Sequence, residues 1–142
     1  MTARLLFYNT LETGSLSDRQ WIDKWCGVYG VTPIIIDLEG RFPRVTPRPP
    51  YGFSSLRDAL ACKEFQGSQW IWLDHRADQY WDEVTLPKDN VIYCIGHDIS
   101  GFQDVEPPGQ MIKVRSPNKD MEAEQWYASM VAAMLLFEVY RK

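Results

Sequence analysis

The sequence has 142 residues, of which 45% are hydrophobic and 13% aromatic. This length and composition are typical of one globular domain with one hydrophobic core, and they exclude a disordered or fibrous chain. The formal net charge of −4 argues against a protein that coats nucleic acid with an overall basic surface, although it allows a local basic patch. We therefore expect a single domain over residues 1–142.

The first predicted elements are a strand and a helix. The apolar run Arg4–Tyr8 predicts a strand, and a polar loop follows it. Ser17 or Asp18 is suited to cap a helix over residues 19–29, in which apolar side chains recur at helical spacing. Gly30 stands where a C-terminal glycine cap belongs, so the helix is expected to end there.

The next part of the chain predicts a strand, a long loop and a second helix. Residues 32–37 are apolar enough for a central strand. Residues 38–53 are rich in proline and are expected to form a loop. Ser54 or Ser55 is suited to cap a helix over residues 56–65.

The remaining elements continue the alternation of strands and helices. Three more apolar runs are predicted as strands, namely residues 69–74, 91–95 and 110–115. Residues 75–89 are expected to be irregular, with one helical turn around 79–82, and residues 121–141 to form the last helix. The order of elements predicts an α/β fold, with a mainly parallel five- or six-stranded sheet flanked by helices.

The last helix is apolar on nearly every side. Its segment 126–137 contains no charged residue. A helix that is apolar all round must be buried on more than one side. In a domain this small, one face can pack on the sheet, and the other is expected to meet a second subunit. The sequence therefore predicts a homodimer through the C-terminal helix.

The cysteines and histidines indicate the cellular compartment and argue against a metal site. The chain has three cysteines, Cys26, Cys62 and Cys94. Their odd number and unpaired spacing favour buried, reduced thiols in a cytoplasmic protein. The two histidines, His75 and His97, form no zinc-ligand pattern with them, so no metal is expected. The longest apolar run, near residues 127–137, is too short to cross a bilayer.

The segment around residue 96 is the first candidate for a ligand site. The run Val91–Ile95 predicts a strand that is buried on both faces, as in a parallel sheet. The glycine-punctuated segment Gly96–Gly101 follows it directly. Glycine lets a ligand come close to the backbone, and open α/β sheets bind ligands beyond the carboxyl ends of their strands. An ordinary strand-to-loop turn is the alternative interpretation.

This segment and two later ones resemble the motifs of a known family. Ile95–Phe102 is similar to a strand-Gly-x-Glu-x-x-Gly-Leu loop, with Asp98 in the glutamate position. Residues 111–117 look like a strand that leads into a proline loop, and residues 132–138 look like a closing Ala-Ala-x-x-Leu-Tyr-Glu helix. These are motifs of the SpoU/TrmH-type branch of the SPOUT RNA methyltransferases, which the chain resembles over almost its whole length.

The start of the chain resembles the remaining motif of the same family. There, an asparagine loop after the first strand leads into a helix with an arginine and then into a Gly-Val pair. In this sequence Asn9 and Gly30 occupy the two ends of that motif, and Lys24 falls at the place of the arginine. Arg19 is a second basic candidate on the same helix. The resemblance implies that Lys24, Asn9 and Arg19 contribute to catalysis.

The resemblance also implies a fold and a cofactor. The family has a C-terminal trefoil knot, forms dimers, and binds S-adenosylmethionine in the knot to methylate RNA, which here implies a tRNA or rRNA nucleotide. The cofactor contacts that it implies fall on Leu73, Ile95, Gly96, Asp98, Gly101, Ile112, Val114 and Ser116.

Two departures from the family pattern leave a second function open. Ala128 falls where the family has an asparagine, and Lys24 cannot make the planar bidentate contact of an arginine. The alternative is a catalytically inactive, knotted dimer that binds S-adenosylmethionine or RNA as a scaffold. A third and weaker interpretation is an unrelated flavodoxin-like regulatory or nucleotide-binding domain.

A proline-rich segment is a candidate for binding RNA. Residues 41–57 contain four arginines, three aromatic residues and no acid. Arg41, Arg44 and Arg48 could contact phosphates while aromatic rings stack on bases. A stiff loop that covers an edge of the sheet is an equally good interpretation of the same residues.

Overall fold

The computed structural model describes residues 3–8, 15–37, 51–96, 102, 105–115 and 128–141, with the side chains of 15–21 and 128–129 excepted. The described strands form one six-stranded sheet in the order β3-β2-β1-β5-β4-β6, in which every neighbouring pair is parallel. The strands are β1 (Arg4–Tyr8), β2 (Thr32–Ile36), β3 (Tyr51–Phe53), β4 (Gln69–Leu73), β5 (Val91–Ile95) and β6 (Gln110–Ile112). This confirms the predicted α/β class.

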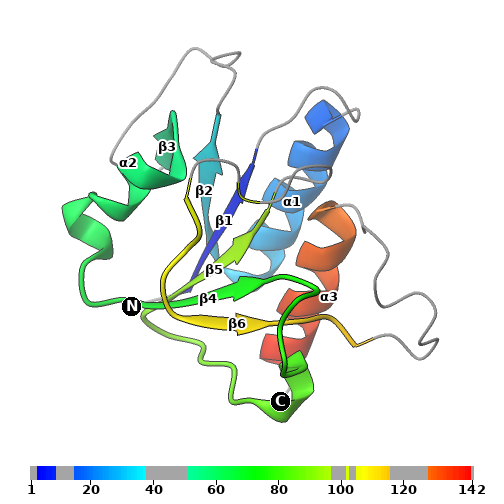
Figure 1. Ribbon diagram of the computed structural model, residues 1–142. Helices are drawn as coiled ribbons and strands as arrows, with labels where there is room; N and C mark the ends of the chain where they lie inside the picture. The colour runs from blue at the N-terminus through cyan, green and yellow to red at the C-terminus, as the bar shows by residue number, and fades with distance from the viewer. Residues whose placement is uncertain are drawn as a thin grey trace.

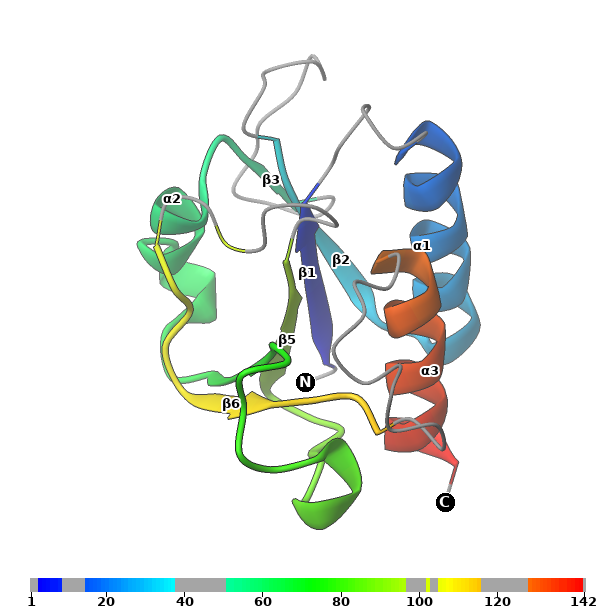
Figure 2. The ribbon, with the colours of Figure 1, turned by 45° about the vertical axis from the view of Figure 1, so that its right-hand side comes forward.

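Helices cover both faces of the sheet. The α-helices are α1 (Ser15–Tyr29), α2 (Leu56–Leu60) and α3 (Ala128–Tyr140), and the 3₁₀-helices are η1 (Lys63–Phe65) and η2 (Trp81–Glu83). Figure 1 shows α1 and α3 side by side on one face of the sheet, with α2 on the other. Figure 2 shows the same three layers from a second angle. Parallel sheets require this cover because both of their faces are apolar.

The two faces of the sheet bury separate apolar clusters. Successive side chains of a strand point to opposite faces, so Phe7 packs with α1 and α3 while its neighbour Leu6 packs with α2. The cluster on the first face includes Leu135 and Leu136 of α3, which are fully buried. The cluster on the second face is rich in aromatic rings, with Phe65 at its centre, in contact with both Tyr51 and Phe53.

The end of α1 is as predicted, but its beginning is not. Gly30 has a φ angle of +69°, and the Val31 amide donates to the Cys26 carbonyl at 2.8 Å. This positive φ angle and this hydrogen bond are those of a glycine C-cap. The helix begins at Ser15, so Ser17 and Asp18 lie inside its first turn instead of capping it. The prediction was wrong because several polar residues here are good caps, and periodicity alone does not choose among them.

The segment 38–53 was predicted as a loop throughout, and this was wrong at its end. Tyr51–Phe53 forms the edge strand β3, paired with β2. A three-residue strand with Gly52 at its centre has little propensity of its own, so its pairing with β2 creates it. The predicted helix over 56–65 is divided into α2 and η1, and Ser55 caps α2 by accepting a hydrogen bond from the Asp58 amide.

Three further boundaries differ from the prediction. The strand predicted over 110–115 ends at Ile112, because the Lys113 amide donates to the carbonyl of Gln79 instead of continuing along β4. The helical turn predicted around 79–82 is η2, slightly later in the chain. The described part of the last helix begins at Ala128, and residues 121–127 of the predicted helix lie outside the described residues.

The topology also decides against one alternative. A flavodoxin-like domain has the strand order 2-1-3-4-5. The observed order places β5 beside β1 and puts β4 between β5 and β6. The flavodoxin-like interpretation was therefore wrong.

The cysteines are buried and unpaired, as predicted. Cys26 lies on the α1 side of the sheet and Cys94 on the α2 side. Burial raises the pKa of the Cys26 thiol to about 12, and the nearby Asp23 adds to this. Burial also raises the pKa of Cys94. In the described part of the chain, no helix has the length and apolar character needed to span a membrane.

Candidate functional site

The carboxyl ends of the strands meet at one edge of the sheet. Because all pairs are parallel, β4, β5 and β6 end side by side. From β1 the chain continues to β2 and β3 on one side of the sheet, whereas β5, β4 and β6 lie on the other side of β1. The strand order therefore reverses between β1 and β5, and open α/β sheets bind ligands at such a point. The sequence placed the candidate ligand site at the end of β5, and the structure puts that end next to the reversal.

Three apolar residues form a row across this edge. Leu73 at the end of β4 pairs with Ile95 of β5 on one side and with Ile112 of β6 on the other. All three face the side of the sheet covered by α1 and α3, and Val114 packs against the same cluster. Gly96 follows Ile95 directly. The structure thus brings together these five predicted cofactor residues.

Other predicted residues lie outside the described part of the chain. Among the predicted cofactor contacts they are Asp98, Gly101 and Ser116, and among the predicted RNA contacts they are Arg41, Arg44 and Arg48. Among the described residues, no group of three or more His, Cys, Asp or Glu side chains could hold a metal ion.

An ion-pair cluster borders the apolar row. The Arg76 guanidinium donates to both carboxylate oxygens of Asp74, at 3.0 and 2.9 Å, and to Glu106 at 3.3 Å. Burial opposes ionisation of Asp74, but the hydrogen bonds and charge of Arg76 outweigh it and lower the pKa of Asp74. The cluster joins the turn after β4 to the segment before β6. His75 lies exposed beside it.

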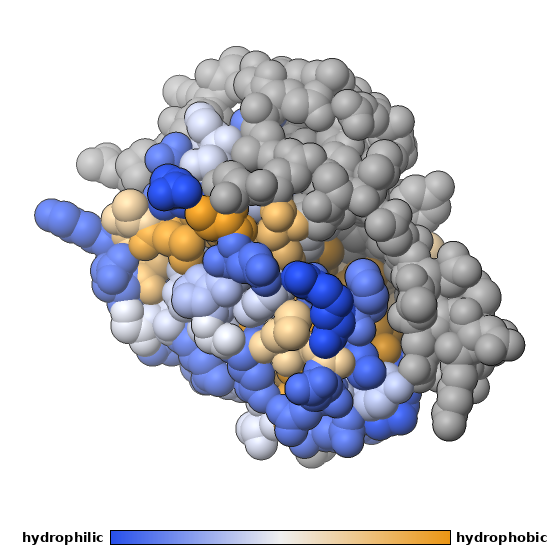
Figure 3. Space-filling view, viewed as in Figure 1, coloured by the Kyte–Doolittle hydropathy of each residue, from blue (hydrophilic) through white to orange (hydrophobic). Residues whose placement is uncertain are grey.

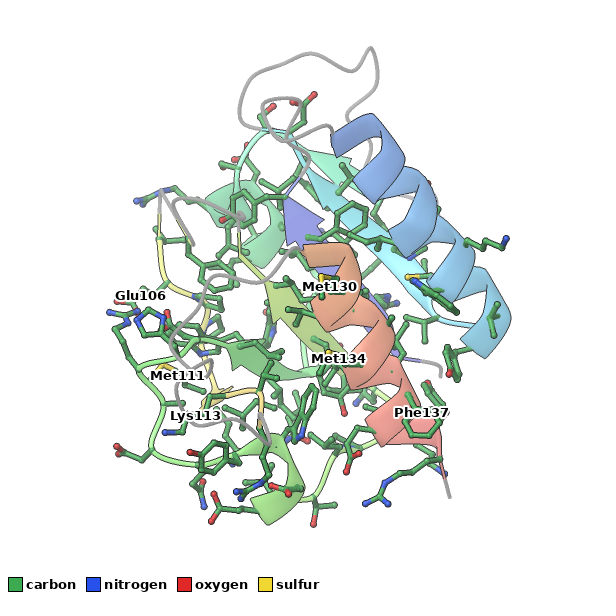
Figure 4. All side chains as sticks on the ribbon, turned by 90° about the vertical axis from the view of Figure 1, so that its right-hand side faces the viewer. Glu106, Met111, Lys113, Met130, Met134 and Phe137 are labelled. Carbon is green, nitrogen blue, oxygen red and sulfur yellow. The ribbon has the colours of Figure 1, made fainter. Side chains whose placement is uncertain are left out.

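A second polar cluster fixes the end of β6. The Lys113 ammonium lies 4.4 Å from the centre of the Tyr80 ring, and the Arg115 guanidinium lies 3.9 Å from it. Arg115 also donates to Asp82 at 2.7 Å. Figure 4 shows Glu106, Met111 and Lys113 along this side of the molecule. Both cations are thus engaged within the protein and hold η2 against the end of β6.

Asp37 is a buried carboxylate that the sequence analysis did not single out. It follows β2 at the same edge of the sheet, the residue is only 5% exposed, and its amide donates to the Phe53 carbonyl at 2.8 Å. A buried carboxylate is costly unless other groups stabilise it. The signal in the sequence was an acid directly after an apolar strand.

The predicted catalytic residues are less closely grouped than the predicted cofactor residues. Lys24 is exposed on α1, nine residues after its first residue, which is about 13 Å along the helix axis. Arg19 is only four residues from that end, about 6 Å along the axis, but its side chain is outside the described set. Asn9 is also outside it. The structure therefore does not place Lys24 next to the apolar row.

The outer surface of α3 carries an apolar stripe, defined here as Met130, Met134 and Phe137. Figure 4 shows the three side chains aligned along the helix. Met130 is 49% exposed and Phe137 is 59% exposed, while Met134 is half-buried. The coloured part of the face seen in Figure 3 is mainly hydrophilic, with apolar areas between the hydrophilic ones. Exposed apolar groups that gather on one helix face are typical of an interaction surface.

Comparison with known proteins connects these features to a fold family. No protein-family model matches the chain, and no curated protein matches it in sequence. The structure of the A. aeolicus TrmH/SpoU tRNA modifying enzyme superposes with a TM-score of 0.72 at 16% identity, covering 99% of this chain and 74% of that chain.

Two further solved structures are similar. A structure concerned with the 2-OH methylation of C/U34 on tRNA superposes with a TM-score of 0.74 at 12% identity, covering 98% of this chain and 89% of that one. An AdoMet-bound rRNA methyltransferase from Sinorhizobium meliloti gives a TM-score of 0.70 at 12% identity, covering 99% and 56% respectively. The protein therefore has the mainly parallel α/β fold of the SpoU/TrmH structures over nearly its whole length.

Proposed function

We propose that the protein is an RNA methyltransferase that uses S-adenosylmethionine, held at the carboxyl edge of β4, β5 and β6. The observation that carries the proposal is the apolar row of Leu73, Ile95 and Ile112, at the edge of a sheet whose fold is that of RNA methyltransferases. One of those similar structures contains bound AdoMet.

The residues present fit this cofactor. An adenine ring needs apolar cover and backbone groups for its polar edge. Leu73, Ile95 and Ile112 are at most 9% exposed, so the half-buried Val114, which packs against their cluster, is the apolar side chain of this edge that remains open to a ligand. Gly96 leaves its side of the edge without a side chain, so backbone can come close to a ligand there. The ion-pair cluster of Asp74, Arg76 and Glu106 holds the neighbouring segments in place.

Methyl transfer depends mainly on how the two reacting groups are positioned. When bound, the cofactor supplies a methyl group on a sulfonium. The protein must hold the acceptor atom in line with that methyl group and exclude water, which the apolar row favours. A basic side chain can bind a phosphate beside the acceptor, or lower the pKa of an acceptor hydroxyl. Lys24 and Arg19 are the candidates, with Asn9 as a polar contact, and Arg41, Arg44 and Arg48 as RNA contacts.

The same proposal includes a homodimer through α3. Leu135 and Leu136 face the sheet, so the stripe of Met130, Met134 and Phe137 is the side of α3 that a second copy would cover. Because Lys24 is exposed on the adjacent helix α1, a dimer is also a route by which it would meet an RNA bound across two subunits. A C-terminal trefoil knot and a cytoplasmic location remain parts of the proposal.

Calorimetric titration tests the cofactor site. We expect S-adenosylmethionine and S-adenosylhomocysteine to bind the purified protein with micromolar dissociation constants. Gly96→Val should weaken binding of S-adenosylhomocysteine by about tenfold or more, because its side chain occupies the space beside the apolar row. The control is Gly27→Val, at an exposed position of α1 where an added Cβ meets nothing within 4 Å. A folded wild-type protein that binds neither compound would contradict the methyltransferase proposal.

A transfer assay separates the enzyme from the inactive scaffold. With radiolabelled S-adenosylmethionine and bulk tRNA or rRNA, we expect methyl incorporation that falls about 10- to 100-fold in Lys24→Ala, the loss expected for one charge-assisted contact. Lys63→Ala, which removes an exposed lysine from η1 on the other face of the sheet, should retain wild-type activity. Cofactor binding without any methyl transfer would favour the inactive scaffold. The alanine at position 128, where the family has an asparagine, is already an argument for that alternative.

A further inference from the structure

The two residues that flank Val114 both place a cation on the same aromatic ring. The Lys113 ammonium is 4.4 Å and the Arg115 guanidinium 3.9 Å from the centre of the Tyr80 ring. Side chains of an extended segment alternate between two sides, so Lys113 and Arg115 share one side and Val114 points to the other. There Val114 packs against the apolar cluster that α1 and α3 cover. The ring contacts therefore hold the backbone on both sides of Val114.

The backbone pairing of this segment stops at Lys113. The Lys113 amide donates to the Gln79 carbonyl, and the Trp81 amide donates to the Lys113 carbonyl, both at 3.0 Å. Within residues 105–115, neither Val114 nor Arg115 belongs to a strand or a bridge. Beyond Lys113, the segment is thus held by the apolar packing of Val114 and by the side chain of Arg115.

Arg115 is bound to a turn that has its own internal bonds. Its Nε donates to Asp82 at 2.7 Å, and its guanidinium lies 3.9 Å from the Glu83 carboxylate. The Tyr80 amide donates to the Glu83 carboxylate at 2.8 Å, and the Glu83 amide donates to the Tyr80 carbonyl at 3.0 Å. Trp81 is only 7% exposed and fixes the turn to the core. Removal of the Arg115 side chain should therefore release residues 114–115 and leave η2 in place.

The contacts of Arg115 are too exposed to contribute much to global stability. The side chains of Arg115 and Asp82 are 44% and 36% exposed. Exposed ion pairs and cation–π contacts change the free energy of unfolding little. They can still set the population of one local conformation, because short segments open at a much lower free energy than the whole protein. A ligand that needs the ordered conformation loses apparent affinity in proportion to the fraction of molecules that lack it.

We propose that Arg115 is a positioning residue of the cofactor site: by stacking on Tyr80 and pairing with Asp82, it holds Val114 at the carboxyl end of β6 and so sets the affinity for the adenosyl cofactor. This inference rests on the proposed function, because Val114 is the open apolar side chain of the same site.

Calorimetry with S-adenosylhomocysteine, combined with thermal unfolding, tests the inference. Arg115→Ala should weaken binding about fivefold, whereas Tm should stay within about 3 °C of the wild type. The control is Lys63→Ala, which removes an exposed cation from η1 on the other face of the sheet and should leave the affinity unchanged. Equal affinity of the wild type and Arg115→Ala would overturn the inference and leave the proposed function intact. If the wild type does not bind, the proposed function has failed first.

Two further variants separate positioning from a direct contact between Arg115 and the ligand. Asp82→Asn keeps Arg115 but removes its ionic partner, so positioning predicts weaker binding, about threefold, and a direct contact predicts none. In a Val114→Ala background, Arg115→Ala should weaken binding by less than about twofold, because the side chain that it positions is gone. Undiminished affinity of Asp82→Asn, or equal losses from Arg115→Ala in the two backgrounds, would overturn the inference. A merely structural role would lower Tm without this dependence on Val114.

Discussion

Replacing Gly109 by alanine is expected to destabilise the protein by about 3–4 kcal/mol, which corresponds to a fall in Tm of about 10 °C. Gly109 immediately precedes β6 and has a φ angle of +87°, in the region that favours glycine. A Cβ at this position would overlap the backbone carbonyl oxygen of Trp70. Because that oxygen belongs to β4, it can move away only if the sheet is distorted. Thermal unfolding followed by circular dichroism measures the effect.

Gly67→Ala is the matched control for this prediction. Gly67 has a similar φ angle of +83°, but an added Cβ there meets nothing within 4 Å. The control variant therefore carries only the conformational cost of a positive φ, about 1 kcal/mol. The difference between the two variants isolates the steric overlap with Trp70. Equal losses in the two variants would show that the contact between β4 and the approach to β6 is looser than described.

The sequence predicted the fold best where the signals are local. The apolar run Val91–Ile95 predicted a strand buried on both faces, and β5 is fully buried there. Gly30 predicted the end of α1 from the conformation that a C-cap requires. Both signals depend only on neighbouring residues. The strand β3 depends instead on pairing with β2, across a proline-rich segment, so no local pattern at Tyr51–Phe53 could predict it.

The part of the candidate site that lies at the ends of strands was predictable from the sequence. Leu73, Ile95 and Ile112 are strand ends, and parallel pairing brings strand ends together. Asp37 shares that edge, but an acid after a strand is too common to be selected without knowing that it is buried. The packing of Phe102 against Tyr8 and Trp72 could not be predicted either, because it exists only if β1 and β4 flank β5.

Lys24 illustrates a different limit of the sequence. Counting back from Gly30 places it at the position of a family motif, but the count does not give its distance from the cofactor edge. That distance depends on the direction of α1, which begins near the carboxyl ends of the strands and runs away from them. Lys24 therefore lies well along the exposed face of α1. Its proposed role requires RNA, or a second subunit, to connect it with the site.

The second large effect is expected in the association of subunits. We expect the wild type to be a dimer at micromolar concentration, and the double variant Met130→Glu and Phe137→Glu to be monomeric, as measured by sedimentation equilibrium. Both residues are exposed in the isolated chain, so the substitutions remove little from the core of one subunit. In a dimer through the apolar stripe, each carboxylate would be buried against apolar groups, at a cost of several kcal/mol. The dissociation constant should therefore rise about 1,000-fold or more.

Ala61→Glu is the control for charge alone, because Ala61 is exposed at the end of α2, on the opposite face of the sheet from α3. This variant should remain dimeric. If the double variant is a folded dimer like the wild type, the interface lies elsewhere and α3 has another partner. If the double variant is a monomer that still binds S-adenosylhomocysteine but no longer methylates RNA, the site needs a second subunit for its acceptor and not for its cofactor. That result would account for an exposed Lys24 on α1, the helix that packs against α3.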